Sequence, residues 1–161
     1  MFTVDDIQTE YLAGLLERYG LRLQVVPAGA AIEGSFWGEP EAGIVGRCVN
    51  VRGDTPVHSL LHETAHLICM DDRRRSVVHR DAGGDDLEEA AVCYLQVVLA
   101  DELPGVGAQR LMQDMDAWGY SFRLGSTARW FAEDAGDARG WLLDQQLLKA
   151  DDKPTFRLRR V

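Results

Sequence analysis

The segment His62-Glu63-Thr64-Ala65-His66 places two histidines four positions apart inside an apolar run. Pro56, just ahead of this run, suits the first position of a helix, where its missing N–H is not needed. On a helix from about Thr55 to Met70, both imidazoles lie on one face and can reach a single metal ion. A helix this apolar must be largely buried, and buried polar side chains need partners, which a metal ion would supply.

Glu63 is rotated by about 100° from His62 around such a helix. It can therefore contact a water molecule at the metal without occupying a ligand position itself. Two nitrogen ligands, an open coordination position and a carboxylate that accepts a proton from water are what metal-assisted hydrolysis requires. The pattern predicts a zinc site with Glu63 as the general base on zinc-bound water. The alternative is a pair of core histidines that are satisfied by hydrogen bonds.

A third protein ligand is expected, because two histidines alone do not hold zinc well. A helix is predicted over Leu87–Leu99, and Glu88 lies on its most apolar face, which favours Glu88 as this ligand. Glu89 is the second candidate. Its position three residues after Asp86 also suits a capping box, and it shares a face with Gln96. The remaining candidates are His79, Asp85 and Asp86.

Peptide hydrolysis also requires a group that stabilises the developing oxyanion. The candidates are Tyr120, His79 and Tyr94, although each could equally be a packing residue. His58 lies one helical turn before His62 and is expected to form a supporting hydrogen bond rather than to bind the metal. A fourth protein ligand, either His58 or His79, would instead favour a purely structural zinc site.

The composition is typical of a soluble globular protein, with 161 residues of which 46% are hydrophobic and 27% charged. This length predicts a single domain over residues 1–161. The net charge of −9 argues against binding to nucleic acid or to an anionic membrane. No segment reaches the ~18 apolar residues of a membrane span, and no signal peptide is evident. Three cysteines without paired spacing favour reduced thiols, so we expect a cytoplasmic protein.

The hydrophobic patterns predict an α+β fold, in which an N-terminal helix over Val4–Tyr19 and a small, mostly antiparallel sheet pack on a helical bundle. The strands are expected at Leu21–Val26, Ser35–Gly38 and Gly43–Val51. The polar segment Asp71–Gly84 is interpreted as a loop. The site-bearing core spans about 21–100, and C-terminal helices follow within about 106–150. Their expected ranges are Val106–Trp118, Ser126–Asp134 and Ala138–Lys149.

The chain resembles the gluzincin metallopeptidases in two motifs. His62-Glu63-x-x-His66 is followed, after a short loop, by Glu88-x-x-Ala91, and gluzincins take their third zinc ligand from a glutamate in such a context on a following helix. With its short length and a helix and small sheet ahead of the histidine helix, the chain is similar to minimal gluzincins and to ImmA/IrrE-type bacterial peptidases. The resemblance covers roughly residues 21–96.

This resemblance implies a zincin-like fold with zinc bound by His62, His66 and Glu88, and with Glu63 as the general base. It also implies a substrate strand that pairs with the sheet edge, expected at Gly43–Val51. We therefore expect a small cytosolic zinc metallopeptidase that acts on a peptide or protein substrate. The alternatives are a zinc hydrolase with another substrate and a non-enzymatic, zinc-containing regulatory or binding module with a protein partner. The sequence leaves cleavage specificity and oligomeric state open.

Overall fold

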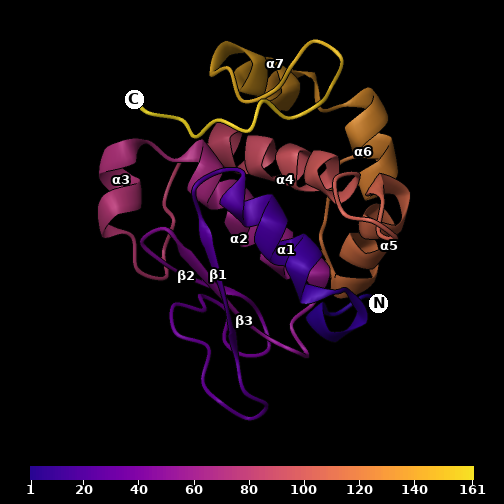
Figure 1. Ribbon diagram of the computed structural model, residues 1–161. Coiled ribbons are helices and arrows are strands. Elements are labelled where there is room, and N and C mark those ends of the chain that lie inside the picture. The colour runs from indigo at the N-terminus through magenta and orange to yellow at the C-terminus, as the bar shows by residue number, and fades with distance from the viewer.

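The computed structural model describes residues 1–161 as seven α-helices and a three-stranded sheet, which confirms the α+β class (Figure 1). A short 3-10 helix, Val4–Asp6, begins the chain. The elements that follow are α1 (Thr9–Glu17), β1 (Arg22–Val26), β2 (Gly43–Val45), β3 (Cys48–Arg52), α2 (Val57–Cys69), α3 (Asp72–Val77), α4 (Asp86–Ala100), α5 (Ala108–Trp118), α6 (Thr127–Glu133) and α7 (Gly136–Asp144).

Helices α2 and α4 form the centre of the fold. Twelve of the 13 residues of α2 and 11 of the 15 residues of α4 are buried, so neither helix keeps a solvent-facing side along its whole length. The two helices pack on each other, while the sheet and α1 lie on one side and α7 covers α4 (Figure 1). The helix predicted over Thr55–Met70 is confirmed. None of the helices combines the length and hydrophobicity that crossing a membrane requires.

The sheet differs from the expected one. Its strand order is β1-β3-β2, and the longer pairing, five residue pairs between β1 and β3, is parallel. Only β2 and β3 pair antiparallel, so the prediction of a mostly antiparallel sheet is wrong. The single strand expected over Gly43–Val51 is instead a hairpin, because Gly46 adopts a left-handed φ of 57° and reverses the chain between β2 and β3.

The strand expected at Ser35–Gly38 does not form, and Ser35 makes only an isolated bridge to Gly43. Gly34 and Gly38 both have positive φ, so this segment turns twice instead of extending. Gly34 also lies directly on the backbone of β2, where a Cβ atom would approach the Ile44 carbonyl oxygen to within 2.4 Å. The turn-rich segment therefore borders the sheet without extending it.

Three helix predictions also need correction, and one is the helix expected over Ala138–Lys149, which begins at Gly136 and ends at Asp144 as α7. The N-terminal helix expected over Val4–Tyr19 is interrupted, because Ile7 is extended and separates the 3-10 helix from α1. The segment Asp71–Gly84 is not entirely a loop, since it contains α3. The Asp71 side chain caps this helix by accepting a hydrogen bond from the Arg74 N–H at 2.8 Å. Because α3 is short and polar, it has no hydrophobic pattern from which a helix could be predicted.

Arg75, on α3, is fully buried and closes the C-terminal end of α2. Its guanidinium donates to the carbonyl oxygens of Leu67 at 2.7 Å, of Met70, and of Arg159 at 2.8 Å. The last carbonyl oxygens of a helix have no intrahelical donor, and Arg75 supplies N–H donors to them. The same contacts, with a hydrogen bond from the Arg159 N–H to the Ile68 carbonyl oxygen at 3.0 Å, fix the C-terminal segment against α2.

Candidate functional site

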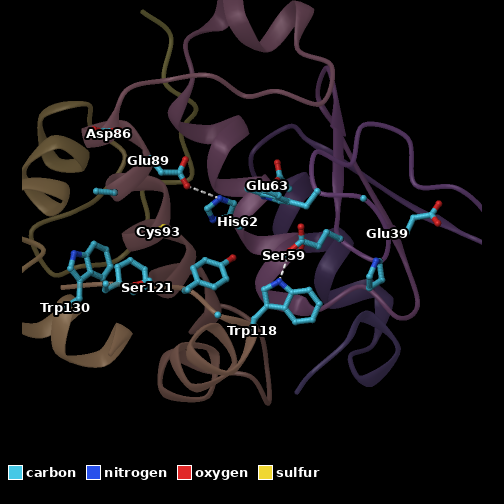
Figure 2. Close-up of a pocket in the computed structure, with 18 residues that line it drawn as sticks. Glu39, Ser59, His62, Glu63, Asp86, Glu89, Cys93, Trp118, Ser121 and Trp130 are labelled. Carbon is cyan, nitrogen blue, oxygen red and sulfur yellow. Dashed lines mark hydrogen bonds and ion pairs between the residues drawn. The ribbon is translucent and has the colours of Figure 1, made fainter. Parts of the chain in front are cut away.

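Three side chains from α2 and α4 converge on one point. The Nε2 atoms of His62 and His66 each lie 3.2 Å from a different oxygen of Glu89. One ligand atom from each residue falls within 4.8 Å of the other two, so the group could hold a metal ion. The predicted one-turn spacing therefore brings both imidazoles to one place, and Figure 2 shows Glu89 directed at His62 from the neighbouring helix.

Glu88, the expected third ligand, does not reach the histidines. It is 5% exposed, and its carboxylate binds the Arg74 guanidinium through two hydrogen bonds of 2.8 and 2.7 Å. Arg159 adds a third hydrogen bond of 3.0 Å. The helical pattern correctly indicated that Glu88 is buried, but its partners are two arginines rather than a metal. In this structure Glu89 takes the place expected for Glu88.

The start of α4 explains why Glu89 is free to face the histidines. Asp85 caps the helix by accepting a hydrogen bond from the Glu88 N–H at 2.8 Å. This cap lies one residue earlier than the expected cap at Asp86, so the capping box that would occupy Glu89 does not form. Burial raises the pKa of Glu89, but hydrogen bonds with the two histidines outweigh burial and lower it well below its usual value. Glu89 is therefore a carboxylate at neutral pH.

Gln96 fixes the orientation of His62. Its Nε2 donates to the backbone carbonyl oxygen of His58 at 2.8 Å, which leaves its Oε1 as an acceptor. This oxygen lies 2.9 Å from His62 Nδ1, so Nδ1 carries the proton and Nε2 faces Glu89. The sequence pattern places Gln96 on the face of Glu89 but does not indicate its role. Its fully buried side chain supports the histidine from behind.

Tyr120 belongs to the same hydrogen-bond network. Its hydroxyl accepts from Gln96 Nε2 at 3.2 Å and lies 3.2 Å from His58 Nδ1, to which it can donate. Burial raises the pKa of Tyr120, so the hydroxyl keeps its proton. Burial, and next to it the charge of His62, lower the pKa of His58 to about 4. Neutral His58 thus accepts a hydrogen bond and stays outside the group of His62, His66 and Glu89, as its expected supporting role requires.

The other two oxyanion candidates lie elsewhere. His79 is half exposed, and its Nε2 lies 3.5 Å from a Glu33 carboxylate oxygen. Tyr94 stacks on Phe131 with ring centroids 4.3 Å apart, and its hydroxyl donates to Asp152 at 3.4 Å. Neither His79 nor Tyr94 lines the cavities beside the histidines. Of the three candidates, only Tyr120 borders one of these cavities, the larger.

Glu63 lies next to His62 on α2 and is 8% exposed (Figure 2). Burial raises the pKa of this carboxylate, while the two imidazoles act in the opposite direction. A carboxylate with a raised pKa is a better proton acceptor near neutral pH than an ordinary one. The predicted general base, Glu63, therefore lies beside the histidine pair, and burial makes its carboxylate more basic.

His62 borders two neighbouring cavities, together termed the cleft, and His66 borders the smaller of the two. The larger has a volume of about 790 Å³ and lies between segment 37–41, α2, α4 and segment 118–122. The smaller, of about 210 Å³, lies toward segment 80–83. Both are lined by the same four residues, which are Trp37, His62, Glu63 and Glu89. In Figure 2, Trp130 and Ser121 lie at one end of the larger cavity and Glu39 at the other, with His62 between them.

The sheet edge expected to receive a substrate strand is occupied by the chain itself. On β2, the Ile44 N–H donates to the Gly34 carbonyl oxygen at 3.2 Å, and the Ile44 carbonyl oxygen accepts from the Arg80 N–H at 2.9 Å. The Gly46 N–H, just after β2, donates to the Val78 carbonyl oxygen at 2.8 Å. The other strand of the hairpin, β3, is central. A peptide cannot pair with Gly43–Val51 in this structure.

Comparison of the chain with protein-family models, with curated proteins and with solved structures finds no match. The function therefore has to be inferred from the site. Its features are a group of two imidazoles and one carboxylate that could hold a metal ion, a second carboxylate beside this group, and a cleft that passes both.

Proposed function

We propose that this protein is a zinc-dependent peptidase. The observation that carries the proposal is the convergence of His62, His66 and Glu89 at the wall of an open cleft, with Glu63 beside them. Two nitrogen ligands and one carboxylate, with room for a further ligand, form a donor set typical of catalytic zinc sites. A purely structural zinc site would have four protein ligands and no need for an adjacent base.

The contact between His62 and Glu89 supports a cation at this point. Because Gln96 holds the proton of His62 on Nδ1, a neutral His62 would turn the Nε2 lone pair toward a carboxylate oxygen only 3.2 Å away. Two acceptors this close repel unless a proton or a metal ion lies between them. Burial opposes a charge on His62, but the groups around it, including the Glu89 carboxylate that contacts its Nε2, raise its pKa above the usual value. The geometry thus favours a positive charge at the position where the metal would bind.

Zinc, when bound, polarises a peptide carbonyl and lowers the pKa of a water molecule toward ~7. Glu63 accepts the proton from the attacking water on its carboxylate and then donates it to the amine that leaves. Gln96 holds His62 in the tautomer that binds a metal through Nε2. Tyr120 and His58 hold Gln96 in turn, so we assign Tyr120 to this supporting network and not to the oxyanion.

A peptide is the substrate class that suits the cleft. The two cavities meet at the histidines, so an extended chain can pass the proposed metal with residues on either side of it. Because the edge of β2 is occupied, binding would depend on contacts with the cleft walls. We also propose a cytoplasmic setting, supported by three cysteines that are all free and buried.

A peptide-library digest tests the proposal. The zinc-loaded protein is incubated with a mixed peptide library, and new termini are identified by mass spectrometry. We expect a defined set of cleavage products that disappears when a chelator removes the metal and returns when zinc is added. Cleavage that survives metal removal would contradict the mechanism. A zinc-loaded protein that cleaves nothing would instead support a non-enzymatic zinc module.

A further inference from the structure

The larger cavity has a strongly acidic lining. Its charged lining residues, apart from His62, are all carboxylates, and neither lysine nor arginine is among them. These carboxylates are Glu39, Glu41, Glu63, Asp86 and Glu89. Two of them, Glu63 and Glu89, belong to the proposed metal centre and are accounted for by the chemistry above.

Two more of these carboxylates have partners or solvent. Glu39 accepts a hydrogen bond from the Ile32 N–H at 3.2 Å, and its other oxygen lies 3.5 Å from the Arg52 guanidinium. Asp86 is exposed in the first turn of α4, where the helix dipole favours a negative charge. Neither residue therefore needs an external cation to balance it.

Glu41 differs from the others. One of its oxygens accepts a hydrogen bond of 2.8 Å from the Trp118 indole N–H, a neutral donor. Its second oxygen is shielded from solvent and has no hydrogen-bond donor within the chain. No cation of the chain balances the charge of Glu41, and the accessible part of its side chain lines the cavity.

The position of Glu41 ties this carboxylate to the proposed reaction centre. The next residue, Ala42, is anchored to α2 by a hydrogen bond of 2.9 Å from its N–H to the Ser59 hydroxyl. Ser59 lies one helical turn before Glu63 and lines the same cavity. Glu41 therefore lines the same cavity as the proposed general base and does not belong to a remote part of the surface.

We propose that Glu41 binds an arginine side chain of the peptide substrate close to the bond that is cleaved. This inference rests on the proposed function, because it names the substrate preference of that same cleft. Trp118 favours arginine over lysine: its half-exposed indole lines the cavity, and a guanidinium can stack on the ring while donating to the carboxylate. The preference should weaken as salt is added, because the cleft is open to solvent.

The test measures peptide binding and not cleavage. In the zinc-loaded Glu63→Gln variant, affinity is measured for peptides in which one arginine is moved along a neutral sequence, each paired with the same peptide carrying citrulline. Citrulline keeps the shape of arginine but has no charge. At one position we expect arginine to bind at least about tenfold more tightly than citrulline, in keeping with the strength of a hydrogen bond to a charged group.

Adding Glu41→Gln should abolish this difference, because the amide can still accept the Trp118 hydrogen bond but carries no charge. Glu39→Gln is the matched control on the same cavity wall, and it should leave the difference unchanged. Circular dichroism checks that each variant is folded, and Glu41→Asp, which withdraws the carboxylate by one methylene, gives an independent intermediate effect.

Equal affinities for arginine and citrulline at every position would overturn the proposal, as would a preference that survives Glu41→Gln. The binding readout also separates this inference from the proposed function. If the protein prefers arginine but cleaves nothing, the arginine site is supported and the peptidase assignment is wrong. If it cleaves peptides without any preference for arginine, the peptidase assignment is supported and the arginine site is wrong.

Discussion

Replacing Glu63 with glutamine is expected to lower kcat for peptide hydrolysis by at least about a hundredfold, at the lower end of what general acid–base catalysis contributes. The amide has nearly the shape of the carboxylate but cannot accept the proton from water. Because Glu63 is not one of the three converging groups, zinc content should stay at the wild-type value. The experiment measures kcat, KM and bound zinc in both proteins.

Glu39→Gln serves as the control for this experiment, since Glu39 lines the same cavity without contacting the histidines. Its kcat should stay close to that of the wild type. If Glu63→Gln cleaved peptides as fast as the wild type, the activity would come from another site or another protein. Loss of zinc together with activity would show that Glu63 supports the metal site instead of acting as the base.

Glu89→Gln is expected to weaken zinc binding by at least about a hundredfold, because loss of a residue that only supports a ligand already costs 10–100-fold. Glu88→Gln should leave zinc affinity nearly unchanged. It removes the charged partner of Arg74 and Arg159 from a buried site, so we expect it to lower the free energy of unfolding by about 3 kcal/mol. Glu89→Gln should thus lose zinc affinity, whereas Glu88→Gln should lose stability.

A competition titration against a coloured zinc chelator measures the first effect, and urea unfolding of the metal-free proteins measures the second. Each variant is the control for the other, since both replace a carboxylate by an amide on the first turn of α4. If Glu88→Gln lost zinc while Glu89→Gln retained it, the ligand role would return to Glu88.

The helix that carries the histidines could be predicted because its signals are local. A long apolar run and a proline at its start define the helix, and two histidines one turn apart define the side that carries the candidate metal ligands. The third candidate ligand, Glu89, could not be predicted in the same way. Burial of Glu88 depends on Arg74 and on Arg159, which lie 14 and 71 residues away in the sequence.

One local signal did point to Glu89. Gln96 lies seven residues later, which is two helical turns, so both side chains lie on the same face of α4. A glutamine on an otherwise apolar stretch needs a polar partner, and that partner is His62. The face of α4 that meets the proposed metal site is therefore marked by its polar residues, whereas the most apolar face packs into the core.

The sheet was harder to predict because its features depend on backbone conformation. The hairpin between β2 and β3 turns at Gly46, within a run whose side chains read as one continuous strand. The parallel pairing of β1 with β3 joins strands that are 22 residues apart at their nearest ends. No local pattern encodes such a pairing, and the occupied edge of β2 follows from backbone contacts with Gly34 and Arg80.

The central claim is that His62, His66 and Glu89 bind one zinc ion. Anomalous diffraction at the zinc absorption edge, on crystals of the protein purified with zinc, tests it most directly. We predict one peak per chain, about 2.0–2.2 Å from the Nε2 atoms of both histidines and from an oxygen of Glu89. A zinc peak at other residues, or no peak at these three in crystals grown with zinc, would contradict the account.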